Sequence, residues 1–275
     1  LSSAIVLAQQ TGRRLAHCWI ACDPVKNAPD FVNRLKLFGF EHFFEFTEFM
    51  PPVNPSIHVD EVFSEWMPGD YWYEMQSSGQ NLLGAIADRR DFDPGSTILE
   101  STAKSILLET SLRVAPFACD GITRHFPDAP HRLLIREAYS RLVPKLEYRE
   151  LLASMQPADI GIWVRAGDLS KFFSPAAQSI DSIATWIASL HQAGHRLVIF
   201  SNDVNIQDHL YSQLNISRLP GQFSRQLCEL PQHKRAALEF FYLALRCSTI
   251  YGTPGSSFAQ EAALLGGKDY CEIPV

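Results

Sequence analysis

The fold of this chain is decided by one stretch, Ile160-Gly161-Ile162-Trp163-Val164-Arg165-Ala166-Gly167-Asp168. Its apolar first half predicts a buried strand over 160–164, and its second half predicts a loop that begins with a cation. A guanidinium offers several donors in a planar fork, so Arg165 is well suited to hold a phosphate. An edge-strand arginine paired with Asp168 is the plainer alternative, and this stretch alone leaves both open.

The residues that follow alternate between strand and helix patterns. Further strands are expected over 197–200 and 248–252, and helices over 179–192, 205–214, 234–245 and 258–265. Such an alternation predicts an α/β fold whose parallel sheet is connected by helical crossovers. In a Rossmann-like sheet of this kind, ligands bind at the carboxyl ends of the strands.

The first half of the chain is less regular. A helix over 2–10, strands over 14–20 and 97–100, and a long helical link from residue 131 are expected. An aromatic-rich run contains Trp66, Tyr71, Trp72 and Tyr73. Flat aromatic faces suit sugar rings, but packing in the core is the commoner role of such residues.

Two later strands also end in polar residues. Ser201-Asn202-Asp203 follows the second predicted strand, and Gly255-Ser256-Ser257-Phe258 follows the third. Asn202 and Asp203 either cap the next helix or touch a nucleotide, and capping is the stronger expectation. The serine pair either caps its helix or forms part of an anion site at the helix N-terminus. Three polar strand ends predict a ligand edge.

These segments resemble the fucosyltransferase superfamily with a GT-B fold, which holds the α1,2-, α1,6- and protein O-fucosyltransferases. Its members carry a strand ending in His-x-Arg-x-Gly/Thr-Asp, then a strand with a Thr/Ser-Asp-Asp-like tip. An Asp-containing helix and a Ser-Ser/Thr-Phe-Ser segment follow. Matching residues stand here in the same order and spacing, over 163–168, 196–203 and 237–259. The resemblance is strongest over 133–271.

The resemblance implies a GT-B-like α/β fold with two Rossmann-like lobes and a cleft between them. Residues 1–150 would form the acceptor-side lobe, and residues 151–275 the nucleotide-sugar-binding lobe. The family's first strand and Gly-rich loop would precede residue 1. The implied activity is that of an inverting, metal-independent glycosyltransferase without a cofactor. It would transfer fucose from GDP-fucose, or the sugar of another GDP-sugar, to a hydroxyl of a glycan or protein acceptor.

The resemblance also assigns roles to residues. Arg165 and Asp168 would be catalytic, Arg165 on the leaving diphosphate and Asp168 either orienting it or acting as a base, with orientation favoured. Glu239 stands where the family's Asp reads the guanine edge, and a solvated helix-face carboxylate is the plainer alternative. The implied nucleotide contacts are Trp163, Arg165, Asn202, Asp203, Glu239, Ser256, Ser257 and Phe258.

Several residues depart from the family pattern. Trp163 stands in place of its His, and Ala166 in place of the second arginine of the α1,6 branch. Phe172 and Phe173 occupy the region where that branch has a carboxylate base. These departures favour, as an alternative, a catalytically inactive nucleotide-sugar-binding domain of the same fold. A Rossmann-like enzyme without sugar chemistry is a third reading, weakened by the lack of a G-x-G-x-x-G pattern.

Composition excludes some classes of protein. The net charge of −6 comes without a basic cluster, so no nucleic-acid partner is expected. No metal site is expected, because the six cysteines lack zinc spacing and Gly194 interrupts the helix between His191 and His195. No run approaches the roughly 20 apolar residues of a membrane span. A cytoplasmic location is favoured, with the Golgi or ER lumen as the alternative if an anchor precedes the chain.

Overall fold

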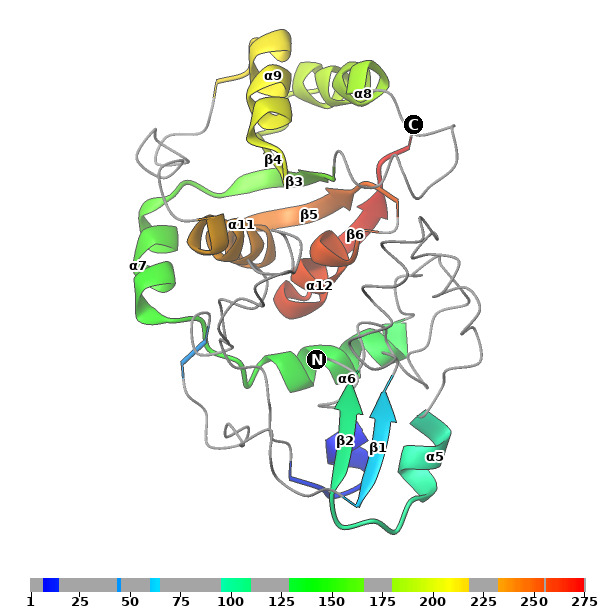
Figure 1. Ribbon diagram of the computed structural model, residues 1–275. Coiled ribbons are helices and arrows are strands. Elements are labelled where there is room, and N and C mark those ends of the chain that lie inside the picture. Colours follow the sequence, from blue (N-terminus) through cyan, green and yellow to red (C-terminus); the bar gives the residue numbers. More distant parts are fainter. Residues whose placement is uncertain are drawn as a thin grey trace, which may run out of the picture. The chain divides into compact units, whose positions relative to one another are not determined.

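The computed structural model describes residues 7–14, 44–45, 60–64, 95–109, 129–165, 180–217, 232–254 and 256–274. The chain divides into two compact units, Leu1–Lys145 and Leu146–Val275. Figure 1 labels their elements. Among the described residues, no helix is long and apolar enough to cross a membrane.

The first unit contains a parallel pair of strands, β1 (Glu61–Ser64) and β2 (Ile106–Glu109). Its described helices include α5 (Gly95–Glu100) and α6 (Ala129–Tyr139), and residues 7–10 are helical as expected. The strand expected over 14–20 lies almost wholly outside the described residues.

The strand predicted over 97–100 is wrong, because these residues belong to helix α5. A short apolar run fits both helix and strand, and tertiary contacts decide between them. Here the guanidinium of Arg13 donates hydrogen bonds to the carbonyls of Ile98, Ser101 and Ala103, at 3.2, 2.6 and 3.2 Å. These bonds satisfy carbonyls at and just beyond the helix end, which lack partners within the helix.

The second unit is a four-stranded parallel sheet in the order β4-β3-β5-β6. Its strands are β3 (Ala158–Val164), β4 (Leu197–Ser201), β5 (Cys247–Gly252) and β6 (Asp269–Glu272). Its helices are α7 (Leu146–Ser154), α8 (Ile180–Gln192), α9 (Val204–Leu214), α11 (Gln232–Arg246) and α12 (Ser257–Gly266). The α/β fold with a parallel sheet is therefore confirmed.

Strand β3 is buried on both faces, as an inner strand of a parallel sheet should be. Ile160, Ile162 and Val164 pack into one core with residues of α8 and α9. On the opposite face, a Cβ added at Gly161 would lie 2.5 Å from Cδ2 of Leu243 in α11. Figure 1 shows α8 and α9 on one side of the sheet and α11 and α12 on the other.

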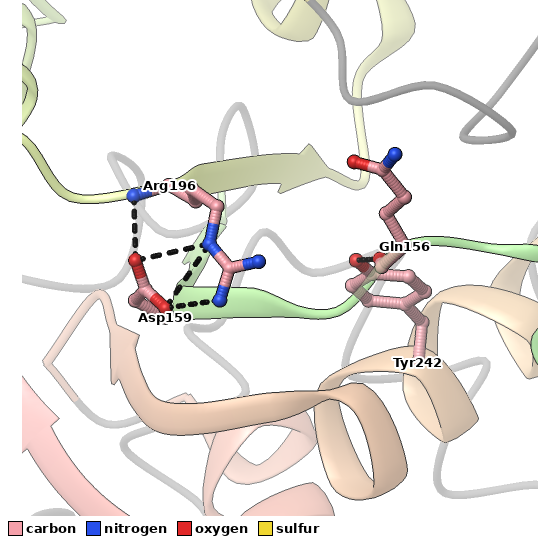
Figure 2. A network of polar contacts seen from close by, with 4 residues as sticks. All are labelled: Gln156, Asp159, Arg196 and Tyr242. Atoms are coloured by element: carbon pink, nitrogen blue, oxygen red, sulfur yellow. Dashed lines mark hydrogen bonds and ion pairs between the residues drawn. The ribbon is translucent and has the colours of Figure 1, made fainter.

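Polar side chains are paired at the amino ends of these strands (Figure 2). Asp159 at the start of β3 accepts hydrogen bonds from Arg196, at 2.6 Å from Nη2 and 2.9 Å from the backbone nitrogen. These bonds lower the pKa of Asp159. The hydroxyl of Tyr242 donates to the carbonyl of Gln156. Together these hydrogen bonds hold the segments that lead into β3 and β4 in place.

Candidate functional site at the carboxyl edge of the sheet

The order of the strands creates a point where the chain changes direction across the sheet. Strand β4 follows β3 in sequence and pairs on one side of it, and β5 pairs on the other side. The connection after β3 runs to β4 on one side, and the connection after β5 runs to β6 on the other, so the connections leave the carboxyl ends of the neighbouring strands β3 and β5 in opposite directions. Ligands of open α/β sheets bind at such switch points, so the ends of β3 and β5 define the candidate site.

Thr253 holds the residues at the ends of β3 and β5 together. Its hydroxyl oxygen accepts a hydrogen bond from the Arg165 backbone nitrogen at 2.8 Å, and its own backbone nitrogen donates to the carbonyl of Trp163 at 3.1 Å. Its carbonyl accepts from the backbone nitrogen of Ser256 at 3.0 Å. Thr253 thus links Arg165 to the start of α12. Thr253 is not among the residues predicted from the sequence, although a hydroxyl at a strand end beside a predicted site is a visible signal.

Ser256 occupies the N-cap position of α12 without acting as a side-chain cap. Its backbone is extended, at φ −73° and ψ 101°, and its hydroxyl makes no capping bond. The residue is completely buried, and its Oγ has no hydrogen-bond partner. Buried hydroxyls are normally paired, so an orphan at a helix N-terminus indicates a place for an acceptor group. Ser257 is the first residue of the helix.

Trp163 packs against the first turn of α12. Its ring is stacked on Phe258, with centroids 3.9 Å apart and an interplanar angle of 20°. Phe240 of α11 meets Phe258 edge-on at 5.4 Å. Trp163 is only 5% exposed, and its indole Nε1 is buried without a hydrogen bond. Trp163, which stands where the resembled superfamily has His, therefore joins the core and carries a second unpaired donor at the strand end.

Asp203 caps helix α9, as expected from the sequence. Its carboxylate accepts a hydrogen bond from the Asn205 backbone nitrogen at 2.9 Å. Its own backbone nitrogen donates to Oγ of Ser201 at 3.1 Å. Asn202 is exposed beside it at the end of β4. The capping bond explains Asp203 without a ligand.

Glu239 is buried in helix α11, so the alternative of a solvated helix-face carboxylate is wrong. Its Oε1 lies 3.3 Å from Nε of Arg235, one turn earlier, and the two side chains are 2% and 11% exposed. Neither of these atoms has a hydrogen bond of good geometry. Burial raises the pKa of Glu239 to about 8, and the charge of Arg235 opposes that rise. Arg235 was not singled out in the sequence, although its i,i+4 spacing was visible.

Some sequence-based expectations fall beyond the described part of the chain. Asp168 and the aromatic residues Trp66, Tyr71, Trp72 and Tyr73 lie outside the described residues. His191 and His195 are exposed. Among the residues that the structure describes, no three His, Cys, Asp or Glu side chains form a group that could hold a metal ion.

Solved structures of two fucosyltransferases share the fold of this chain. NodZ alpha-1,6-fucosyltransferase soaked with GDP-fucose superposes with a TM-score of 0.51 and 18% sequence identity, over 96% of this chain and 86% of that one. POFUT1 in complex with GDP-fucose gives a TM-score of 0.52 and 10% identity, over 100% and 92%. No protein-family profile and no curated protein sequence matches. The likeness confirms the fucosyltransferase-like fold that the sequence resemblance implied.

Proposed function

We propose that this protein is a glycosyltransferase that takes its sugar from GDP-fucose and transfers it to a hydroxyl of a glycan or protein acceptor. The observation that carries the proposal is the buried, unpaired hydroxyl of Ser256 at the start of α12, linked through Thr253 to Arg165. The fold shared with two fucosyltransferases, each recorded with GDP-fucose, supports the choice of donor.

The proposed chemistry follows from the charge that develops on the leaving group. When the glycosidic bond to the donor breaks, the diphosphate gains negative charge, which the enzyme must stabilise. The Arg165 guanidinium can donate a forked pair of hydrogen bonds to phosphate oxygens. The N-terminus of α12 adds backbone N–H groups and its dipole, and the Ser256 hydroxyl adds one further donor.

We propose further that transfer inverts the anomeric configuration and needs no metal ion. Arg165 and the start of α12 supply the positive potential that a divalent cation supplies in other transferases. Transfer should therefore proceed unchanged in EDTA. A loss of activity that magnesium or manganese restores would contradict metal independence but not the choice of donor.

The burial of Trp163 favours a second candidate. Its ring is stacked on Phe258 where the family has a His, so any nucleotide contact made by that His side chain is replaced by core packing. A chain that kept the donor site and lost catalytic groups would bind GDP-fucose without transferring it. In the first candidate, the active transferase, Asp168 would orient the Arg165 guanidinium.

One pair of measurements tests both candidates. Calorimetric titration with GDP, UDP and ADP should show selective binding of GDP, because only guanine offers two adjacent ring-edge donors to Glu239. Hydrolysis of GDP-fucose by the purified protein should then be detectable as free fucose. Binding without hydrolysis or transfer would favour the inactive domain, and equal binding of the three nucleotides would overturn the GDP-sugar assignment.

A further inference from the structure

The pair of Arg235 and Glu239 has no evident structural purpose. Replacing a buried ion pair by apolar residues is often neutral or stabilising, because removing two charges from water costs as much as their attraction returns. In this pair the attraction between the charges stabilises the fold even less, since Nε of Arg235 and Oε1 of Glu239 lie 3.3 Å apart without hydrogen-bond geometry. A buried carboxylate with an unsatisfied oxygen is instead suited to accept donors from a ligand.

We propose that Arg235 is a positioning residue for base recognition, which offsets the cost of ionising Glu239 so that its carboxylate accepts both ring-edge donors of guanine. The inference rests on the proposed function, and it adds a residue that acts through Glu239. Arg235 lies in the first half of α11, and Glu239 stands at its middle. Because α11 leads into the amino end of β5, this half belongs to the carboxyl edge of the sheet.

The protonation state of Glu239 decides which hydrogen-bonding groups its carboxyl presents to guanine. An ionised carboxylate is an acceptor at both oxygens, so it can pair with N1–H and N2–H of guanine together. A neutral carboxyl group places its own O–H against one of those donors. Burial favours the neutral form, and Arg235 favours the charged one. Without Arg235, guanine would have to supply the whole cost of removing the proton.

Other charged and titratable groups lie on the elements that pack against α11. Those elements carry Glu147, Tyr148, Arg149 and Glu150 on α7, Glu261 on α12, and Cys247 and Tyr251 on β5. Glu147 is engaged with Lys234 at 3.4 Å, and the ring of Tyr148 faces Phe241. The charge of Arg235 lowers the pKa of Glu239 and so opposes the effect of burial.

The test compares the binding of GDP and of inosine diphosphate, which lacks the 2-amino donor, to the full chain from about pH 6 to about pH 8.5. In the parent protein, the preference for GDP should rise with pH as Glu239 ionises. In Arg235→Met, the preference at pH 7.5 should fall about tenfold, and its rise should move to higher pH. Arg235→Lys keeps the charge and should recover much of the preference.

Lys234→Met is the matched control. It removes a positive charge from the adjacent position of the same helix, but the lost partner is Glu147 at the surface. The preference for GDP and its pH dependence should therefore be unchanged. A second control, Glu239→Gln, cannot ionise, so its weaker binding of GDP should not depend on pH in this range.

The possible outcomes separate this inference from the proposed function. If the parent protein does not prefer GDP to UDP and ADP, the proposed function fails first. If it does, and Arg235→Met keeps the parent's preference over inosine diphosphate and its pH profile, the role of Arg235 is refuted. Should Arg235→Met not fold, Arg235→Lys carries the test, because its different reach should shift the same profile in the same direction by a smaller amount.

Discussion

The two ends of the sheet in the second unit differ in how completely their polar groups are paired by hydrogen bonds. At the amino ends of β3 and β4, Asp159 and Arg196 satisfy each other, and Tyr242 donates to a backbone carbonyl. Arg246 also donates to the Met155 carbonyl there, although its Nε has no partner. At the carboxyl edge, Ser256 Oγ and Trp163 Nε1 are buried without partners. The amino end is thus largely paired as folded, whereas the carboxyl edge keeps two buried donors that the proposed ligand would pair.

Two carboxylates show the same contrast in their acidity. Hydrogen bonds from Arg196 lower the pKa of Asp159, whose side chain is partly exposed. Burial raises the pKa of Glu239 to about 8 in spite of Arg235. An acid held in its charged form serves structure over the whole neutral range. An acid held near the point of ionisation can respond to a ligand.

The largest effect is expected from Arg165→Ala at the carboxyl edge. It should abolish transfer and weaken GDP binding by about 2–4 kcal/mol, because a charge-assisted pair at a phosphate is lost. Arg165→Lys should also be poor, since a point charge does not replace the planar fork. Titration calorimetry and a transfer assay measure both. Turnover equal to the parent's in Arg165→Ala would remove the carboxyl edge as the active site.

The next effect concerns stability and pH. The pKa of Glu239 is near its ordinary value of 4.5 in the unfolded chain and about 8 in the folded protein. Between these values the unfolded chain binds fewer protons, so the second unit should lose stability as pH rises from about 5 to about 8. The loss should be on the order of a few kcal/mol, since one pKa unit corresponds to about 1.4 kcal/mol.

Thermal unfolding across that pH range checks this prediction, with Glu239→Gln as the comparison. The variant has no carboxyl group to ionise, so its unfolding temperature should fall less between about pH 5 and about pH 8. Identical curves for the two proteins would mean that Glu239 is solvated in solution, and its proposed contact with guanine would lose its basis.

A smaller effect separates ligand binding from folding at Ser256. Ser256→Ala removes a buried hydroxyl that has no partner, so stability should stay the same or rise slightly. GDP binding should weaken by about 1–2 kcal/mol, because the phosphate loses one donor. Unfolding and titration on the same preparation give both numbers. Lower stability with unchanged affinity would show that the hydroxyl serves the fold.

The smallest effect is expected at the amino end. Arg196→Ala breaks a partly exposed pair with Asp159, and pairs near the surface contribute little to stability. The unfolding temperature should drop slightly, and more at neutral than at acidic pH, because Asp159 must be charged for the pair to form. GDP affinity should not change. A clear loss of affinity would mean that the two ends are coupled.

Much of the second unit could be predicted from the sequence because its signals are strong and local. Strand β3 is a nearly continuous apolar run, and α8 shows a clear helical spacing of apolar residues. Strand β6 was missed because its residues, Asp269–Glu272, are mostly exposed and lack an apolar pattern. The helix α5 was mistaken for a strand because Arg13, distant in sequence, binds its last turn.

The candidate site was predicted in part. Arg165 and Ser256 follow from polar residues at strand ends, and the structure brings their backbones together through Thr253. The strand-end hydroxyl of Thr253 and the i,i+4 spacing of Arg235 and Glu239 are visible in the sequence, but only the fold shows that these residues belong to the site. Thr253 depends on the pairing of β3 with β5, and the burial of Arg235 depends on how α11 packs. A charged residue on a helix is usually solvated, so spacing alone does not reveal a buried pair.

Among the described strands, β6 has the features of a border that discourages pairing with other chains. It is short, its first and last residues are acidic, and it forms the border beside β5. Removing residues 268–275 would leave the unpaired backbone of β5, whose Thr249, Ile250 and Tyr251 favour strand pairing, as the new border. Exposed borders of this kind recruit further strands. A truncated chain should therefore aggregate during folding, which would lower the yield of folded protein, even though residues 268–275 carry none of the proposed ligand contacts.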